Sequence, residues 1–82
     1  MYSNSMKSNL PHAFSKAIKS LRTKKGLSQE GLADIAGLDR TYISGIEREI
    51  RNPTIKSIQK IIIALDESDS DFLELIREHL ND

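Results

Sequence analysis

The sequence predicts an all-α domain of five helices, and three observations support this prediction. Apolar residues recur at helical spacing in five successive stretches of the chain. No run of alternating β-branched residues stands between turn signals, so nothing indicates a sheet. Residues that cap or end helices separate the stretches. With 82 residues the chain has room for one small domain, and a partner subunit would add to the stability of its limited core.

The first helix is expected to begin near Pro11, which suits an N-terminal turn, and to end before Gly26. The second helix is expected to follow Ser28, a good N-cap, and to end at Gly37. The apolar positions of the first helix are Leu10, Phe14, Ala17, Ile18 and Leu21. Those of the second helix are Leu32, Ala33 and Ile35.

The third helix is expected to follow Asp39 as its N-cap and to run to about Arg48. After a turn at residues 52–53, Thr54 is expected to cap a fourth helix that runs to about Leu65. The apolar positions of this fourth helix are Ile55, Ile58, Ile61, Ile62 and Leu65.

The fifth helix is expected to begin at Ser68 or Asp69, either of which can cap it. Its apolar positions are Phe72, Leu73, Ile76 and Leu80. Residues 10–82 are therefore expected to form a single domain, whereas the polar residues 1–9 are expected to form a flexible arm. Either the first methionine or Met6 can be the true start of the chain.

The composition excludes several classes of protein. The absence of cysteine rules out a disulfide scaffold and a zinc site built on thiolates. No apolar stretch reaches the roughly 18–20 residues of a membrane span, and the amino-terminal residues lack the apolar segment of a signal peptide. We therefore expect a cytoplasmic protein with no membrane partner, no cofactor and no metal.

The chain has no net charge, but its charges are unevenly distributed. Residues 1–58 carry ten Lys and Arg against five Asp and Glu, a net charge of +5. Residues 59–82 carry two against seven, a net charge of −5. Such a charge dipole allows one end of the molecule to approach phosphates while the other end stays away from them.

Residues 29–48 carry the most informative pattern in the chain. A small residue, Ala33, lets two helices cross closely, and Gly37 allows a positive φ in a tight turn. Ile43 and Ile46 then attach the second helix of the pair to the core. This is the helix-turn-helix arrangement, whose second helix lies in the major groove of DNA.

The third expected helix separates polar from apolar residues, as a groove-reading helix must. At about 100° per residue, four side chains with donors share one arc: Arg40, Thr41, Ser44 and Arg48. Ile43 and Ile46 lie across from this arc, which no acidic residue interrupts. Tyr42 lies on its flank and Glu47 at its edge. Gly45 costs a helix about 1 kcal/mol relative to alanine, which favours a close approach to a neighbour over neutral drift.

Two helix starts offer groups for phosphates. Ser28 and Gln29 begin the second helix, where free amides and the positive end of the helix dipole suit an anion. A second cluster of donors surrounds the start of the fourth helix: Arg51, Asn52, Thr54 and Ser57. On the third helix, Arg40 can donate two hydrogen bonds to guanine, and the Thr41 methyl can contact thymine.

The stretch LSQEGLADIAGLDRTYISGIEREIRNPTIKSI resembles the helix-turn-helix domain of the phage-repressor and Cro-like regulators. Within that group, DRTYISGIER followed by RNPTIKS is similar to the small controller proteins of restriction–modification systems. The resemblance covers nearly the whole chain and implies a five-helix lambda-repressor-like fold. It also implies a homodimer that binds a double-stranded, pseudo-palindromic operator and regulates its own gene and an endonuclease gene.

The resemblance assigns roles by position in this sequence. The residues expected to read or contact bases are Arg40, Thr41, Tyr42, Ser44 and Arg48. Besides Ser28 and Gln29, the residues expected to hold phosphates are Arg51, Asn52, Thr54 and Ser57. A regulator that activates transcription would also contact RNA polymerase, through a surface that the sequence does not locate.

The fourth and fifth helices carry more apolar surface than one small core needs. Ile63 falls outside the apolar stripe of the fourth helix, and Leu75 falls outside that of the fifth, which contains Phe72. Exposed apolar patches tend to mark interfaces, so we predict a dimer interface formed by Ile63, Leu75 and Phe72. Ile63 and Leu75 could instead bury each other within one chain.

Two alternative functions remain: a phage-type repressor, and an antitoxin whose main partner is a protein. An enzyme is disfavoured, because neither His12 nor His79 has a metal-ligand partner at helical spacing. No nucleophile motif and no phosphate-binding glycine loop is found. Glu47 and Glu49 are expected to be a solvated edge of the third helix rather than an acid/base pair.

Overall fold

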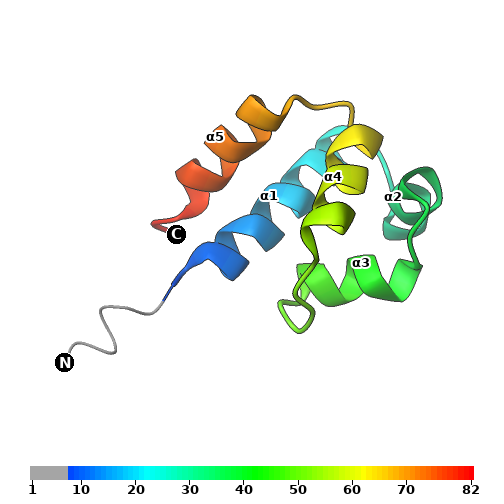
Figure 1. The fold of residues 1–82 in the computed structure, drawn as a ribbon, viewed down its shortest axis with the longest axis horizontal. Coiled ribbons are helices and arrows are strands. Elements are labelled where there is room, and N and C mark those ends of the chain that lie inside the picture. Colours follow the sequence, from blue (N-terminus) through cyan, green and yellow to red (C-terminus); the bar gives the residue numbers. More distant parts are fainter. Residues whose placement is uncertain (1–7) are drawn as a thin grey trace.

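The computed structural model describes residues 8–82, which form five α-helices and no strand. The helices are α1 (Leu10–Lys24), α2 (Gln29–Ala36), α3 (Arg40–Glu47), α4 (Ile55–Ala64) and α5 (Asp69–His79) (Figure 1). The predicted all-α fold class and all five predicted elements are confirmed. None of the helices in this part of the chain is long and apolar enough to cross a membrane.

Three of the helices begin at the predicted capping residues. In each, a side-chain hydroxyl accepts a hydrogen bond from the amide three residues ahead, at 2.9 to 3.1 Å; the residues are Ser28, Thr54 and Ser68. Each such cap stabilises its helix by about 1 kcal/mol. Asp39 does stand at the N-cap position of α3, but its side chain makes no capping hydrogen bond. The prediction for this side chain was therefore wrong.

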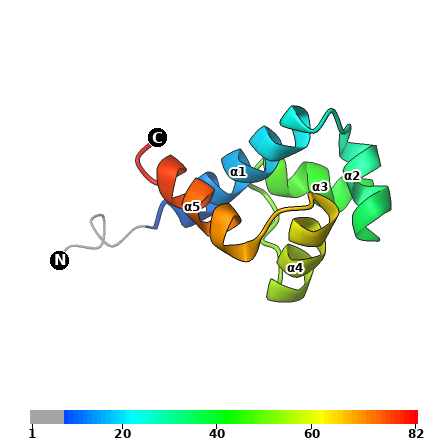
Figure 2. The same cartoon turned by 90° about the horizontal axis from the view of Figure 1, so that it is seen from above.

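The five helices share one hydrophobic core. α1 runs alongside α5, and α2 packs against α3 and α4 (Figures 1 and 2). The buried aliphatic residues of α3 and α4 are Ile43, Ile46, Ile61 and Ile62. At the α1–α5 contact, the rings of Phe14 and Phe72 meet edge to face, with centroids 5.6 Å apart. Burial of each such side chain contributes about 1.5–3 kcal/mol, so this pair fixes α5 to the body.

Only two residues of the expected amino-terminal arm, Ser8 and Asn9, lie within the described part of the chain. Residues 1–7 of the expected arm lie outside the described residues. Asn9, expected in the arm, donates a hydrogen bond from Nδ2 to the carbonyl oxygen of Leu80 at 2.6 Å. The Ser8 hydroxyl accepts one from the amide of Leu10 at 3.1 Å. Asn9 thus contacts the end of α5, whereas Ser8 contacts the first residue of α1.

Candidate nucleic-acid interface

The turn between α2 and α3 has the geometry that the glycine predicted. Gly37 has φ of +69°, a left-handed conformation that costs glycine little because it has no Cβ. Leu38 then donates its amide to the carbonyl oxygen of Ala33 at 2.9 Å, which closes the end of α2. Ala33 is itself buried, as expected of a small residue where two helices cross. The turn sets the angle at which α3 leaves α2.

α3 has one buried face and one exposed face. Ile43 and Ile46 are buried in the core, as predicted. On the opposite face Arg40, Thr41 and Arg48 are exposed and Ser44 is half-buried, so four of the five predicted base-reading residues share one surface. The structure thus places this donor arc where a DNA groove could reach it.

Glu47 corrects one prediction. It was expected at a solvated edge, but its side chain is only 4% exposed. Its carboxylate accepts hydrogen bonds from Arg22 Nε at 2.6 Å and Nη2 at 2.9 Å, and a third from Gln29 Nε2 at 3.1 Å. Hydrogen bonding to this carboxylate raises the pKa of Arg22, against the opposing effect of burial. The group joins α1, α2 and α3 beneath the exposed face of α3.

Sequence reasoning missed Arg22, although a signal existed. Arg22 lies four residues after Ile18 and so on an inward-facing part of α1, where a lone cation needs a buried partner. It also donates to the carbonyl oxygen of Leu27 at 2.8 Å, which fixes the loop before α2. Because Gln29 donates to Glu47, only the amino end of α2 remains for the phosphate contact predicted there.

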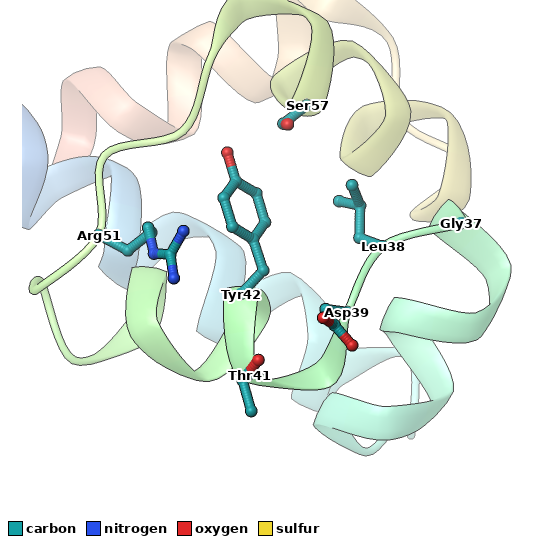
Figure 3. A pocket seen from close by; sticks show the side chains of 7 residues that line it. All are labelled: Gly37, Leu38, Asp39, Thr41, Tyr42, Arg51 and Ser57. Carbon is teal, nitrogen blue, oxygen red and sulfur yellow. The ribbon is translucent and has the colours of Figure 1, made fainter.

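Tyr42 points away from the exposed arc of α3 and toward α4. Its hydroxyl accepts a hydrogen bond from the amide of Thr54 at 3.3 Å, and its ring lies 5.3 Å from the guanidinium carbon of Arg51. Tyr42 and Arg51 border an open depression of about 360 Å³. Figure 3 shows its lining: Gly37, Leu38, Asp39, Thr41, Tyr42, Arg51 and Ser57. The depression therefore brings together four predicted DNA-contacting residues from α3, the following loop and α4.

The loop from α3 to α4 folds back on α3 at Gly45. The Gly45 carbonyl oxygen accepts hydrogen bonds from the amides of Ile50 at 2.9 Å and Arg51 at 3.1 Å. A Cβ added to Gly45 would lie 3.0 Å from the Cβ of Arg51. The close approach predicted for this glycine is confirmed, and its neighbour is the loop of the same chain.

The predicted phosphate residues do not all share one surface. Thr54 Oγ1 caps α4 and also donates to the Ser57 hydroxyl at 3.1 Å, so both lie at the amino end of α4. Asn52 instead lines an apolar groove. Among residues 8–82, no ion pair includes Arg40, Arg48 or Arg51, so their charges are available to an anion.

Comparisons with known proteins agree with this geometry. A family model described as "Helix-turn-helix" matches residues 18–72. The control protein C.BamHI of Bacillus amyloliquefaciens is 40% identical over 84% of this chain and 86% of its own length. The control protein C.SmaI of Serratia marcescens is 45% identical over 62% of this chain, and the match spans 61% of that protein's length.

The chain belongs to the helix-turn-helix family. Among solved structures, the restriction–modification controller protein C.Esp1396I is 46% identical, with a TM-score of 0.87 over 93% of this chain and all of the other. A tetramer of that controller protein has been crystallised with its natural 35-base-pair operator. The predicted resemblance to controller proteins is therefore confirmed, and one of these relatives, C.Esp1396I, has been crystallised bound to its operator DNA.

A second surface of this helix-turn-helix protein is apolar. A groove of about 470 Å³ runs between the start of α1, the start of α4 and α5. Its lining residues are Ser8, Leu10, Pro11, Phe14, Asn52, Pro53, Ile55, Ile58, Phe72, Leu73 and Ile76. Ile55 is 81% exposed and Leu73 is 63% exposed, although helical spacing grouped both with the core positions of their helices.

The three residues of the predicted dimer interface differ in how much surface they expose, and this changes which of them can contact a second subunit. Phe72 is 1% exposed and belongs to the chain's own core, so it offers almost no area to a second subunit. Leu75 is half-buried and packs against the same core. Ile63 is 70% exposed but does not line the groove. Ile63 therefore remains a candidate contact, and the groove is a second candidate that the sequence did not reveal.

Proposed function

We propose that the chain is a restriction–modification controller protein that binds a pseudo-palindromic operator as a homodimer and regulates its own gene and an endonuclease gene. The observation that carries this proposal is the donor arc of α3, which is exposed and which Glu47, at its edge, ties to α1 and α2. The similarity to controller proteins supports it along most of the chain.

In the proposed complex, α3 lies in the major groove. Arg40 at its first position donates two hydrogen bonds to a guanine, while Thr41, Ser44 and Arg48 contact bases or the adjoining backbone. The amino ends of α2 and α4 face phosphates on either side, since their amides and helix dipoles favour an anion. Phosphate contacts set the position of the protein, and base contacts give the specificity.

The distribution of charge supports this orientation. α5 carries most of the acidic excess and lies on the opposite side of the molecule from α3 (Figure 1). Placing α3 against DNA therefore keeps the acidic helix away from the phosphates. The exposed acidic residues of α5 do not line the apolar groove, so they stay available to another protein, such as RNA polymerase in an activator.

We propose that dimerisation uses the apolar groove. Three elements converge on it, and two large aliphatic side chains, Ile55 and Leu73, stand exposed at its wall. Ile63 is a single exposed residue, and scattered apolar side chains are normal on a monomer surface. A two-fold dimer would place two α3 helices about 34 Å apart, which is one turn of DNA.

Selection from a random duplex library with purified protein tests the proposal, at about the physiological ionic strength of 0.15 M. We expect an inverted repeat with half-sites about ten base pairs apart. A match to the selected site upstream of the protein's own gene would support the controller role. Recovery of no consensus, with only weak salt-sensitive binding, would contradict the proposal and favour a protein-binding module such as an antitoxin.

A further inference from the structure

Arg51 is held in place from two sides by α3. Its amide donates to the carbonyl oxygen of Gly45 at 3.1 Å, and the absence of a Cβ at Gly45 leaves room for the Arg51 stem. Its guanidinium lies over the ring of Tyr42, 5.3 Å from the ring centroid. Both contacts come from residues of α3 that lie beside the donor arc, next to the depression that Thr41 also lines.

Tyr42 also fixes the start of α4. Its hydroxyl accepts the Thr54 amide at 3.3 Å, and Thr54 caps α4. One side chain of α3 thus contacts both the capping residue of α4 and the cation of Arg51, which lines the depression in Figure 3. The ring is half-buried between these groups and is directed toward α4 rather than along the exposed arc of α3.

We infer that Tyr42 and Gly45 are positioning residues, which hold Arg51 ready for the DNA backbone before DNA arrives. Tyr42 then contributes to binding through Arg51 rather than by reading a base, the role that the sequence suggested. This inference rests on the proposed DNA-binding function. An unrestrained arginine loses much rotamer freedom when it binds, so a side chain already ordered on a ring binds with a smaller entropic cost.

A double-mutant cycle on the selected operator duplex tests the inference. We expect Arg51→Ala to weaken binding about tenfold, and Tyr42→Leu to weaken it about two- to fivefold, the range of an exposed cation–π contact. In the R51A background, Tyr42→Leu should have almost no further effect, because its target is gone. Additive effects of the two changes would overturn the inference.

Three further variants make the cycle specific. Tyr42→Phe keeps the ring and should restore most of the coupling to Arg51. Gly45→Ala places a methyl group 3.0 Å from the Cβ of Arg51 and should weaken binding less in the R51A background, where the displaced loop carries no guanidinium. Leu38→Ala is the matched control, since Leu38 lines the same depression but is not stacked on Arg51; its effect should add to that of R51A. Gly45→Ala also keeps the test valid if Tyr42→Leu fails to fold.

The base preference of Tyr42→Leu gives an independent readout. If Tyr42 acts through Arg51, selection with this variant should return the wild-type consensus with lower affinity at every site. Loss of preference at one base pair would show that Tyr42 reads that base and would overturn the inference. If wild-type protein binds no duplex specifically, the proposed function fails instead, so the two failures are distinguishable.

Discussion

Arg40 stands at the first position of α3 with an exposed side chain, and no ion pair among the described residues occupies it. Arg40→Ala should cost about 1–3 kcal/mol of operator binding and relax the preference at one base pair, because arginine pairs with guanine through two hydrogen bonds. Titration against operators with single base-pair changes measures both effects. An equal loss on every sequence would mean that Arg40 contacts only the backbone.

Glu47 is predicted to matter for stability more than any exposed acid. Glu47→Ala should lower the free energy of unfolding by about 2–4 kcal/mol, since it leaves the largely covered Arg22 cation with only the Leu27 carbonyl as a partner. Urea unfolding followed by circular dichroism measures the change.

The matched control for Glu47 is Glu74→Ala, which removes the exposed i,i+3 pair with Arg77 at 3.0 Å. Exposed pairs of this kind contribute about 0–1 kcal/mol, so the control should unfold almost like the wild type. Similar losses in the two variants would show that burial does not decide the strength of the Glu47 pair.

For single residues, the sequence predicted which face of a helix a side chain occupies better than it predicted which neighbours surround that side chain. The helical wheel placed Ile43 and Ile46 inward, and they are buried. It also placed Glu47 at the edge, but an angle on one helix does not show which neighbour covers that edge. Arg22 and Gln29 reach it from two other helices, and that contact depends on tertiary packing.

The start of α4 and the loop before it act together, because Ser57 and Arg51 both line the depression beside α3. Arg51→Ala should weaken binding to all DNA sequences about equally and reduce the slope of log affinity against log salt by about one. Affinities measured at several salt concentrations, on operator and non-operator duplexes, check this. A change of preference at one base pair would instead assign Arg51 to base reading.

Helix ends were predictable because their signals are local. Ser28, Thr54 and Ser68 bond to amides three residues away, and a glycine with positive φ ends α2. Asp39 was the exception. It does precede α3 as predicted, but its side chain does not make the capping hydrogen bond. The position of a helix end follows from the local sequence, whereas the hydrogen-bond partner of a capping side chain also depends on the residues packed around it.

At the scale of the whole molecule, two equivalent substitutions distinguish the candidate dimer surfaces. Leu73→Glu introduces a charge at the groove and should give a monomer with much weaker operator affinity, because a charge is costly to bury. Ile63→Glu makes the same type of change outside the groove and should leave the dimer intact. Light scattering measures the mass of each; a monomeric I63E beside a dimeric L73E would reverse the assignment.

The groove shows where sequence reasoning stops. Spacing identified an apolar stripe on each of α1, α4 and α5, and each stripe does pack into the core. The apolar stripes of three helices need not cover one another completely. The size of the groove left between α1, α4 and α5 depends on the angles at which these helices cross. Periodicity within single helices carries no information about those angles, so the exposure of Ile55 and Leu73 was not predictable.

The inward direction of Glu47 has a consequence for how operator preference can change. Glu47 fastens α3 to the body from the edge of the donor arc, and its carboxylate bonds to Arg22 and Gln29 rather than to any residue of that arc in the described part of the chain. Substitutions at Arg40, Thr41 and Ser44 can therefore alter the recognised site while the angle of α3 persists. Such a helix allows a lineage to retarget its regulator by a few surface changes, without rebuilding the fold.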